Sequence, residues 1–382
     1  MKYVFNDGVM FIKIKGVLYD QNMENLVKFP EEKEINSYAI PDEIKVIEKG
    51  AFQNNKHLKE VSFNRNITKI KKKAFKKSKK LKNIIIPVDV DFIGKSAFEK
   101  CAKLKRVKFE GNISKLGSAV FSGCKSLEEI NIPQLHAISA LCFSDCKSLT
   151  SIEIPSSIEI IKESAFADCE SLKEIKLSEN LKVIKDLAFS GNLSLHNIDL
   201  PEGLTTIGDR AFKECTNLET ICIPTSVTKI GLGAFEDCKS LQKVCINSKI
   251  NLIQELLFHG CSKLKEIKLP LSVTCIKSFA FSSCKNLDSI EMGSNVTDIE
   301  DCAFIGCLKL TNIELPQSLL NIGKSAFQYC GSLEKIKIPS SVIFIGKLAF
   351  DNCIAIKEIE VVKDSYADIY LKEIGFKNLI KY

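Results

Sequence analysis

The stretch Ile223–Ile246, "IPTSVTKIGLGAFEDCKSLQKVCI", places four apolar residues three positions apart and then stops the pattern: Phe235, Cys238, Leu241 and Val244. A helix would continue this spacing and a strand would alternate, so neither period accounts for it. The segment "LPEGLTTIGDRAFKECTNLETICI", 23 residues earlier, has the same pattern. Such a repeat predicts a stack of similar coils rather than one globular core.

Phenylalanines mark this repeat along most of the chain. Twelve of the thirteen spacings between them are 23 residues and one is 22. The ladder consists of Phe52, Phe75, Phe98, Phe121, Phe143, Phe166, Phe189, Phe212, Phe235, Phe258, Phe281, Phe304, Phe327 and Phe350. Counted from each Phe, position +3 is Cys in eleven of fourteen repeats, position +6 is Leu in thirteen, and positions +9 and +11 are always apolar. These sites are too few for a domain but enough for one coil of a solenoid.

Each coil is expected to carry one longer and one shorter strand. Apolar positions +9 and +11 alternate with polar +8 and +10, which indicates a half-buried strand, and a following Pro such as Pro270 has no amide donor and ends it. An apolar pair such as Val227 and Ile230 predicts the shorter strand, and "GAFEDC" is expected to form one helical turn. We therefore predict a β-rich, α/β-type solenoid arc of about 14 coils, capped at both ends. Its concave face would carry a parallel sheet, and its convex face the short strands and helical turns.

The pattern "I-x-x-A-F-x-x-C-x-x-L-x-x-I-x-I-P-x-x-V-x-x-I" resembles the BspA-type leucine-rich repeat family over about residues 41–362. The two ends resemble that family's caps. "GVLYDQNMENLVKFP" resembles its hairpins, and Ser365 with Asp368 predicts a helix capping box. We expect a hairpin cap over residues 1–40, a solenoid over 41–362 and a helix/strand cap over 363–382, in one continuous structural domain.

This resemblance implies a ligand-binding solenoid, often secreted or displayed on bacteria or parasitic protists, with roles in adhesion and in host or matrix protein binding. No segment has the roughly 18 uncharged apolar residues of a membrane span. Lys13 and Lys15 interrupt the apolar amino terminus, so no signal-peptide core is expected there. An intracellular interaction scaffold is the alternative function, and localisation at the cell surface, outside the cell or in the cytoplasm stays open.

The outer strand positions, +8 and +10, are the expected partner site. They vary between repeats while the core positions do not, which favours a scaffold with a specialised surface. A broad face of mixed charge suits an extended or large protein partner better than a small molecule. The expected binding columns contain Glu174, Lys176, Asp199, Lys243, Glu266, Lys268, Glu291, Glu314, Lys335 and Lys337.

A lysine run forms a second candidate surface. Its nine lysines have no acid among them and exceed the net charge of +7 of the whole chain, so the basic character is local. No exposed aromatic residues are expected between them, which disfavours nucleic acid. The run predicts either an ordinary solvated face or attachment to a polyanion or an anionic membrane surface. Its lysines are Lys69, Lys71, Lys72, Lys73, Lys76, Lys77, Lys79, Lys80 and Lys82.

Sixteen cysteines raise the question of a disulfide or metal framework. Eleven occupy the same +3 position, where Asn55, Ser78 and Asn192 replace them, so we predict buried thiols that pack. Cys222 and Cys245, at +10 of neighbouring coils, are either a bonded or reactive pair or a chance pair of exposed thiols. Nucleophile, zinc and phosphate-loop motifs are absent, so no catalytic residue, no metal site and no cofactor is expected.

Overall fold

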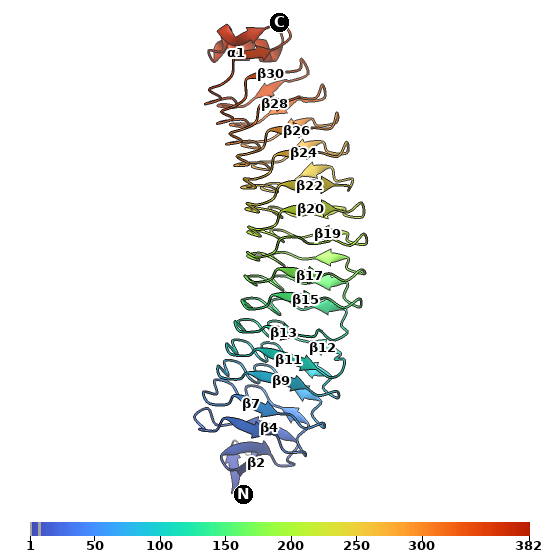
Figure 1. Cartoon of the computed structure of the whole chain (residues 1–382), viewed down its shortest axis with the longest axis vertical. Coiled ribbons are helices and arrows are strands. Elements are labelled where there is room, and N and C mark those ends of the chain that lie inside the picture. The colour runs from blue at the N-terminus through green and yellow to red at the C-terminus, as the bar shows by residue number, and fades with distance from the viewer. Residues whose placement is uncertain (1, 7–8) are drawn as a thin grey trace. The chain divides into compact units, whose positions relative to one another are not determined.

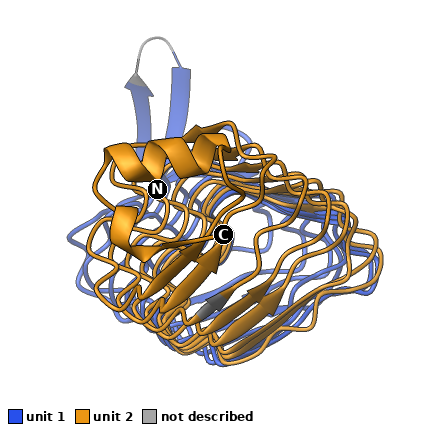
Figure 2. Ribbon diagram, turned by 90° about the horizontal axis from the view of Figure 1, so that it is seen from above, with its two compact units in different colours: residues 1–193 blue, residues 194–382 orange. Residues whose placement is uncertain are grey.

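A computed structural model describes residues 2–6 and 9–382 of the chain. They form two compact units, residues 1–193 and residues 194–382, coloured separately in Figure 2. Each unit is a β-solenoid whose successive coils pair in parallel, with strands labelled in Figure 1. The predicted solenoid with parallel sheets is confirmed, and the described residues contain a single α-helix.

Unit 1 begins with antiparallel hairpins made by β1 (Lys2–Asn6), β2 (Val9–Ile14), β3 (Val17–Asp20) and β4 (Asn25–Lys28). β4 also pairs in parallel with β6 (Val46–Ile47), and β5 (Ser37–Ala39) pairs in parallel with β7 (Glu60–Ser62), so the first strands of the parallel sheets lie before residue 41. The longer strands of this unit are β5 (Ser37–Ala39), β7 (Glu60–Ser62), β9 (Asn83–Ile86), β11 (Arg106–Phe109), β13 (Glu129–Ile130), β15 (Ser151–Glu153) and β17 (Glu174–Lys176). Its short strands are β6 (Val46–Ile47), β8 (Lys69–Ile70), β10 (Phe92–Ile93), β12 (Lys115–Leu116), β14 (Ala137–Ile138), β16 (Ile160–Ile161) and β18 (Val183–Ile184).

Unit 2 repeats this arrangement and ends in a helix. Its longer strands are β20 (Thr220–Ile223), β22 (Lys243–Ile246), β24 (Glu266–Lys268), β26 (Ser289–Glu291), β28 (Asn312–Ile313), β30 (Lys335–Lys337) and β32 (Glu358–Glu360). Its short strands are β19 (Thr206–Ile207), β21 (Lys229–Ile230), β23 (Leu252–Ile253), β25 (Cys275–Ile276), β27 (Asp298–Ile299), β29 (Asn321–Ile322) and β31 (Phe344–Ile345). The helix α1 (Tyr366–Glu373), the 3-10 turn η1 (Lys377–Leu379) and β33 (Ile380–Lys381) follow, and β33 pairs with β32.

The longer strands show the alternation that the sequence predicts. In β24 the side chain of Ile267 is buried, whereas Glu266 and Lys268 are exposed. The parallel register aligns Glu266 with Ser289 and Lys268 with Glu291 on β26. Equivalent residues of successive coils therefore stand side by side, and the outer positions form columns.

The ladder phenylalanines are buried and their rings stack. Centroids of consecutive rings are 4.6 to 5.8 Å apart in unit 1 and 5.2 to 5.7 Å apart in unit 2. The ladder begins one coil earlier than we predicted. Phe29 lies 23 residues before Phe52 and stacks on it at 5.0 Å.

The segments around these phenylalanines are hydrogen-bonded turns, so the expected helical turn is wrong. Gly233 and Asp237, two residues before and two after Phe235, have φ angles of 56° and 58°, and the other coils from Phe52 to Phe350 repeat this pattern. Left-handed residues at both places interrupt a right-handed helix. Instead, the N–H of Glu236 donates to the carbonyl of Gly233 at 2.9 Å, and the N–H of Phe235 reaches Leu257 of the next coil at 3.1 Å.

The +3 cysteines are buried, as predicted, but packing is only part of their role. The thiol of Cys261 donates to the carbonyl of Phe235 in the preceding coil at 3.3 Å, and nine other thiols make the equivalent bond. The hydroxyl of Ser78 and the amide of Asn192 donate to Phe52 and Phe166 in the same way, at 2.8 and 3.0 Å. In these coils the position holds a hydrogen-bond donor.

Truncation of one ladder ring should destabilise the solenoid strongly. Phe281→Ala removes a fully buried ring between two stacked neighbours. We expect a loss of about 3–5 kcal/mol in the free energy of unfolding, and a smaller loss for Phe281→Leu, which fills more of the space. Urea unfolding monitored by circular dichroism measures both, and an alanine variant within about 1 kcal/mol of the parent would contradict the ladder's role.

Substitution of a +3 cysteine should separate its hydrogen bond from its volume. Cys261→Ser keeps a donor for Phe235, whereas Cys261→Val keeps an apolar side chain and loses the donor. We expect the valine variant to be less stable than the serine variant by about 1 kcal/mol, the usual net value of a hydrogen bond. A valine variant that unfolds at higher urea concentration than the serine variant would reduce the position to packing alone.

Candidate functional site

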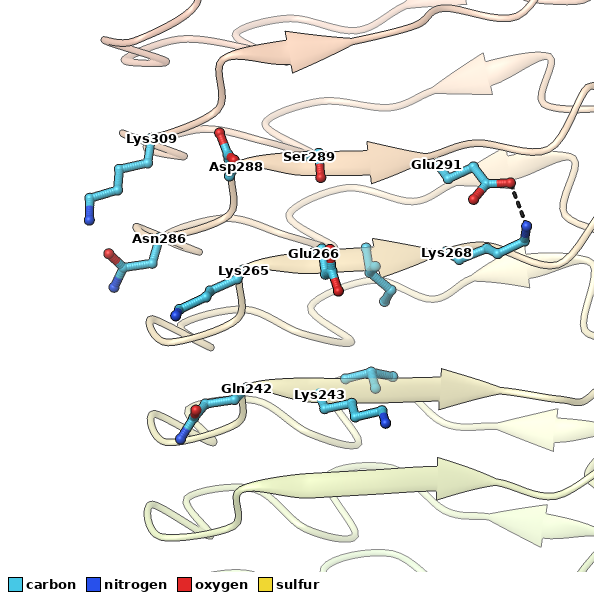
Figure 3. A pocket seen from close by; sticks show the side chains of 12 residues that line it. Gln242, Lys243, Lys265, Glu266, Lys268, Asn286, Asp288, Ser289, Glu291 and Lys309 are labelled. Carbon is cyan, nitrogen blue, oxygen red and sulfur yellow. Dashed lines mark ion pairs between the residues drawn. The ribbon is translucent and has the colours of Figure 1, made fainter.

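An open hollow of about 930 Å³ lies on the outer side of three longer strands in unit 2 (Figure 3). It lies over β22, β24 and β26, and we call it the strand-face hollow. Its lining residues are Gln242, Lys243, Val244, Lys265, Glu266, Ile267, Lys268, Asn286, Asp288, Ser289, Glu291 and Lys309.

The alternation of the strands creates this site. The +9 side chains Val244 and Ile267 are buried, so only polar +8 and +10 residues project from the strands themselves. Lys265 and Asp288 precede their strands and stand at one edge of the hollow, whereas Lys268 and Glu291 stand at the other (Figure 3). The site is therefore a polar surface on a rigid apolar base.

The charged side chains of the hollow form few ion pairs within the protein, and these are weak. The Nζ atom of Lys268 lies 2.6 Å from Oε1 of Glu291, but the two side chains are 74% and 65% exposed. Solvent weakens such a pair to roughly 0–1 kcal/mol. Within the described part of the chain, no ion pair involves Lys243, Lys265 or Lys309. These ammonium groups can therefore meet acidic groups of a partner without breaking a strong internal contact.

The lining is composed chiefly of groups that can form ion pairs with a partner. Four lysines and three carboxylates line the hollow, and neither a histidine nor a cysteine stands among them. The described residues also contain no group of three or more His, Cys, Asp and Glu side chains placed to hold a metal ion.

Four of the predicted column residues meet at the strand-face hollow: Lys243, Glu266, Lys268 and Glu291. The other six are exposed and lie outside the hollow: Glu174 and Lys176 on β17 of unit 1, Lys335 and Lys337 on β30, and Asp199 and Glu314 outside the named strands. The hydrogen bonds that Lys335 donates to Glu358 and then to Glu360 raise the pKa of its ammonium group, which keeps that group charged.

The strand pattern did not indicate the residues that complete the hollow. Gln242, Lys265 and Asp288 occupy position +7, and Asn286 and Lys309 occupy position +5. These positions precede the strand, so its alternation does not say which way they face. Their polar character on consecutive repeats was the only available signal.

The predicted thiol pair is adjacent in the structure. Cys222 and Cys245 are register partners on β20 and β22, and both are free thiols. The hydrogen bond with Cys245, followed by partial burial, raises the pKa of Cys222. Since the thiolate is the nucleophile, this environment slows reaction at neutral pH.

Thiol labelling should distinguish this pair from the buried column. Cys222 is exposed and Cys245 half-buried, whereas the eleven +3 cysteines are buried. We expect a thiol reagent at pH 8 to modify Cys222 first and the +3 cysteines only after unfolding, with all sixteen reactive in denaturant. Mass spectrometry of the labelled peptides identifies the sites, and early labelling of the +3 column would contradict the burial of these side chains.

Comparison with known proteins places the chain in a repeat family. The model of the BspA type leucine rich repeat region matches residues 28–147, 136–265 and 251–378. The chain belongs to this family. A leucine-rich repeat protein from Bacteroides ovatus is 26% identical, with a TM-score of 0.76, over 100% of this chain and 97% of that one. A leucine rich cell surface protein from Faecalibacterium prausnitzii is 23% identical, with a TM-score of 0.51, over 94% of both chains.

No curated protein matches the chain. Members of the BspA-type leucine-rich repeat family are generally non-catalytic, and leucine-rich repeats commonly bind proteins.

Among residues 2–6 and 9–382, the helices lack the length and apolar character that a membrane-spanning helix needs.

Proposed function

We propose that this BspA-type repeat protein is a non-catalytic binding protein that holds a protein partner on the outer face of its longer strands. The observation that carries the proposal is the strand-face hollow, where charged side chains from four successive coils stand on a rigid base and the described residues form only one ion pair among them, which is exposed. A partner that presents complementary charges would gain contacts there without unfolding or rearranging the solenoid.

The shape and chemistry of the hollow favour a protein over a small molecule. Its lining is open and made chiefly of flexible, charged side chains, whereas small-molecule sites are enclosed and mostly apolar. The columns also continue beyond it along unit 2, to Glu314, Lys335 and Lys337. An extended or large protein surface could contact several coils at once.

We further propose that this binding serves adhesion or the recognition of a host or matrix protein. One protein with the same fold, that of F. prausnitzii, is described as a cell surface protein, which is a setting where such binding occurs. An exposed sheet face whose charges differ from coil to coil suits selective recognition of a large ligand.

Reversing the charge pattern of the hollow should weaken partner binding without changing stability. The double variant Lys268→Glu/Glu291→Lys keeps an ion pair but exchanges its ends, so the free energy of unfolding should change by less than about 0.5 kcal/mol. We expect at least about tenfold weaker binding, because the partner then meets like charges. Partners captured from matrix and host-cell extracts are identified by mass spectrometry and purified, and interferometry measures their affinity for both proteins.

A matched exchange tests whether the effect belongs to this surface. Lys45→Glu/Glu24→Lys exchanges an exposed pair, 2.5 Å apart, outside the hollow. The proposal requires this control to bind like the parent. Equal affinity of the hollow variant and the parent for every purified partner would place the binding site elsewhere.

A further inference from the structure

Lysines from different coils of unit 1 align into a column. Lys59, Lys82 and Lys105 occupy position +7 of three successive coils, and all three are exposed. The backbone N–H of Lys82 donates to the carbonyl of Lys59 at 2.9 Å, and that of Lys105 donates to Lys82 at 2.7 Å. The backbone ladder therefore holds three ammonium-bearing side chains one coil apart.

The same coils carry two further lysine columns. Lys80 and Lys103 occupy position +5 on neighbouring coils, and Lys72 and Lys95 occupy position −3; all four are exposed. The lysine run found in the sequence thus contributes only one residue to each column. Residues 23 positions before or after it contribute the others.

Most of these column lysines form no ion pair with the residues that the structure describes. Lys71 and Lys76 of the run pair with Glu48 and Glu99 at 2.7 and 2.8 Å. In the +7 column only Lys105 pairs, with Glu128 at 2.9 Å.

For the remaining lysines of these columns the described residues provide no ion pair: Lys59, Lys72, Lys80, Lys82, Lys95 and Lys103. Like charges on adjacent strands destabilise a sheet slightly. The fold gains nothing from this alignment, whereas an anionic ligand would relieve the repulsion.

We propose that these lysine columns form a second binding surface, for a linear sulfated polysaccharide that runs across successive coils. Each column repeats at the coil spacing of about 4.8 Å, which suits a chain with regularly repeated anionic groups. Between residues 45 and 115 the phenylalanines are buried except for Phe63 and Phe92, which are half-buried, and this disfavours the base stacking that binds single-stranded nucleic acid. The polysaccharide would bind through its sulfate groups to the ammonium groups of several coils.

Heparin fragments and size-matched dextran sulfate provide the test, with the full chain and isothermal titration calorimetry. The variant Lys80→Gln/Lys82→Gln/Lys103→Gln removes three charges from two columns. The control Lys162→Gln/Lys173→Gln/Lys185→Gln removes three exposed charges from elsewhere in unit 1. We expect the column variant to bind at least about tenfold more weakly and the control to bind like the parent. Binding of the parent should disappear near about 0.5 M salt, because screening weakens exposed charges.

Three outcomes would overturn the proposal: no binding by the parent, equal loss in both variants, or equal or tighter binding of single-stranded RNA or phosphatidylserine vesicles. Circular dichroism confirms that both variants are folded, since exposed Lys→Gln changes alter stability little. The test is independent of the protein partner, because none of the substituted lysines lines the strand-face hollow.

Discussion

The peptide group and ring of one phenylalanine per coil connect each coil to its neighbours. In the coil of Phe235 the backbone N–H donates to Leu257 in the next coil, and the carbonyl accepts the N–H of Cys238 and the thiol of Cys261. The ring stacks on the phenylalanines on either side. One residue thus makes a hydrogen bond within its own turn, accepts the thiol hydrogen bond of the next coil and stacks in the core. These contacts favour a nearly constant spacing, and the one 22-residue coil, from Phe121 to Phe143, keeps both the ring stack at 5.8 Å and the thiol bond of Cys146 to Phe121 at 3.3 Å.

Since this network is satisfied inside, the outer positions carry little of the stability. Exposed pairs such as Lys268 with Glu291 contribute little in water. The strand face can therefore change its charges from coil to coil without loss of the fold. This freedom explains how one repeat pattern carries both the mixed charges around the strand-face hollow and the lysine columns of unit 1.

The sequence predicted the elements that depend on periodicity, and it missed features that depend on backbone conformation. The burial of Ile267 between exposed Glu266 and Lys268 follows directly from alternation. The left-handed residues of the turns were missed because they include ordinary residues such as Glu214 and Tyr329. The recurrence of Gly two residues after several phenylalanines was a usable signal. The hydrogen bond of the +3 cysteines could not be predicted, because its acceptor is a backbone carbonyl 26 residues earlier.

Each surface residue of this solenoid has two sets of neighbours, one along the chain and one across the coils. Along the chain, Lys82 belongs to a run of lysines, and Lys265 is an isolated charge beside a strand. Across the coils, the 23-residue period makes Lys59 and Lys105 the neighbours of Lys82, and it brings Asp288 beside Lys265. The strand alternation alone predicted only the columns at +8 and +10. Because stacking fixes the neighbour of every residue, a surface property of this protein belongs to a position repeated over several coils, and binding energy accumulates along a column rather than along the chain.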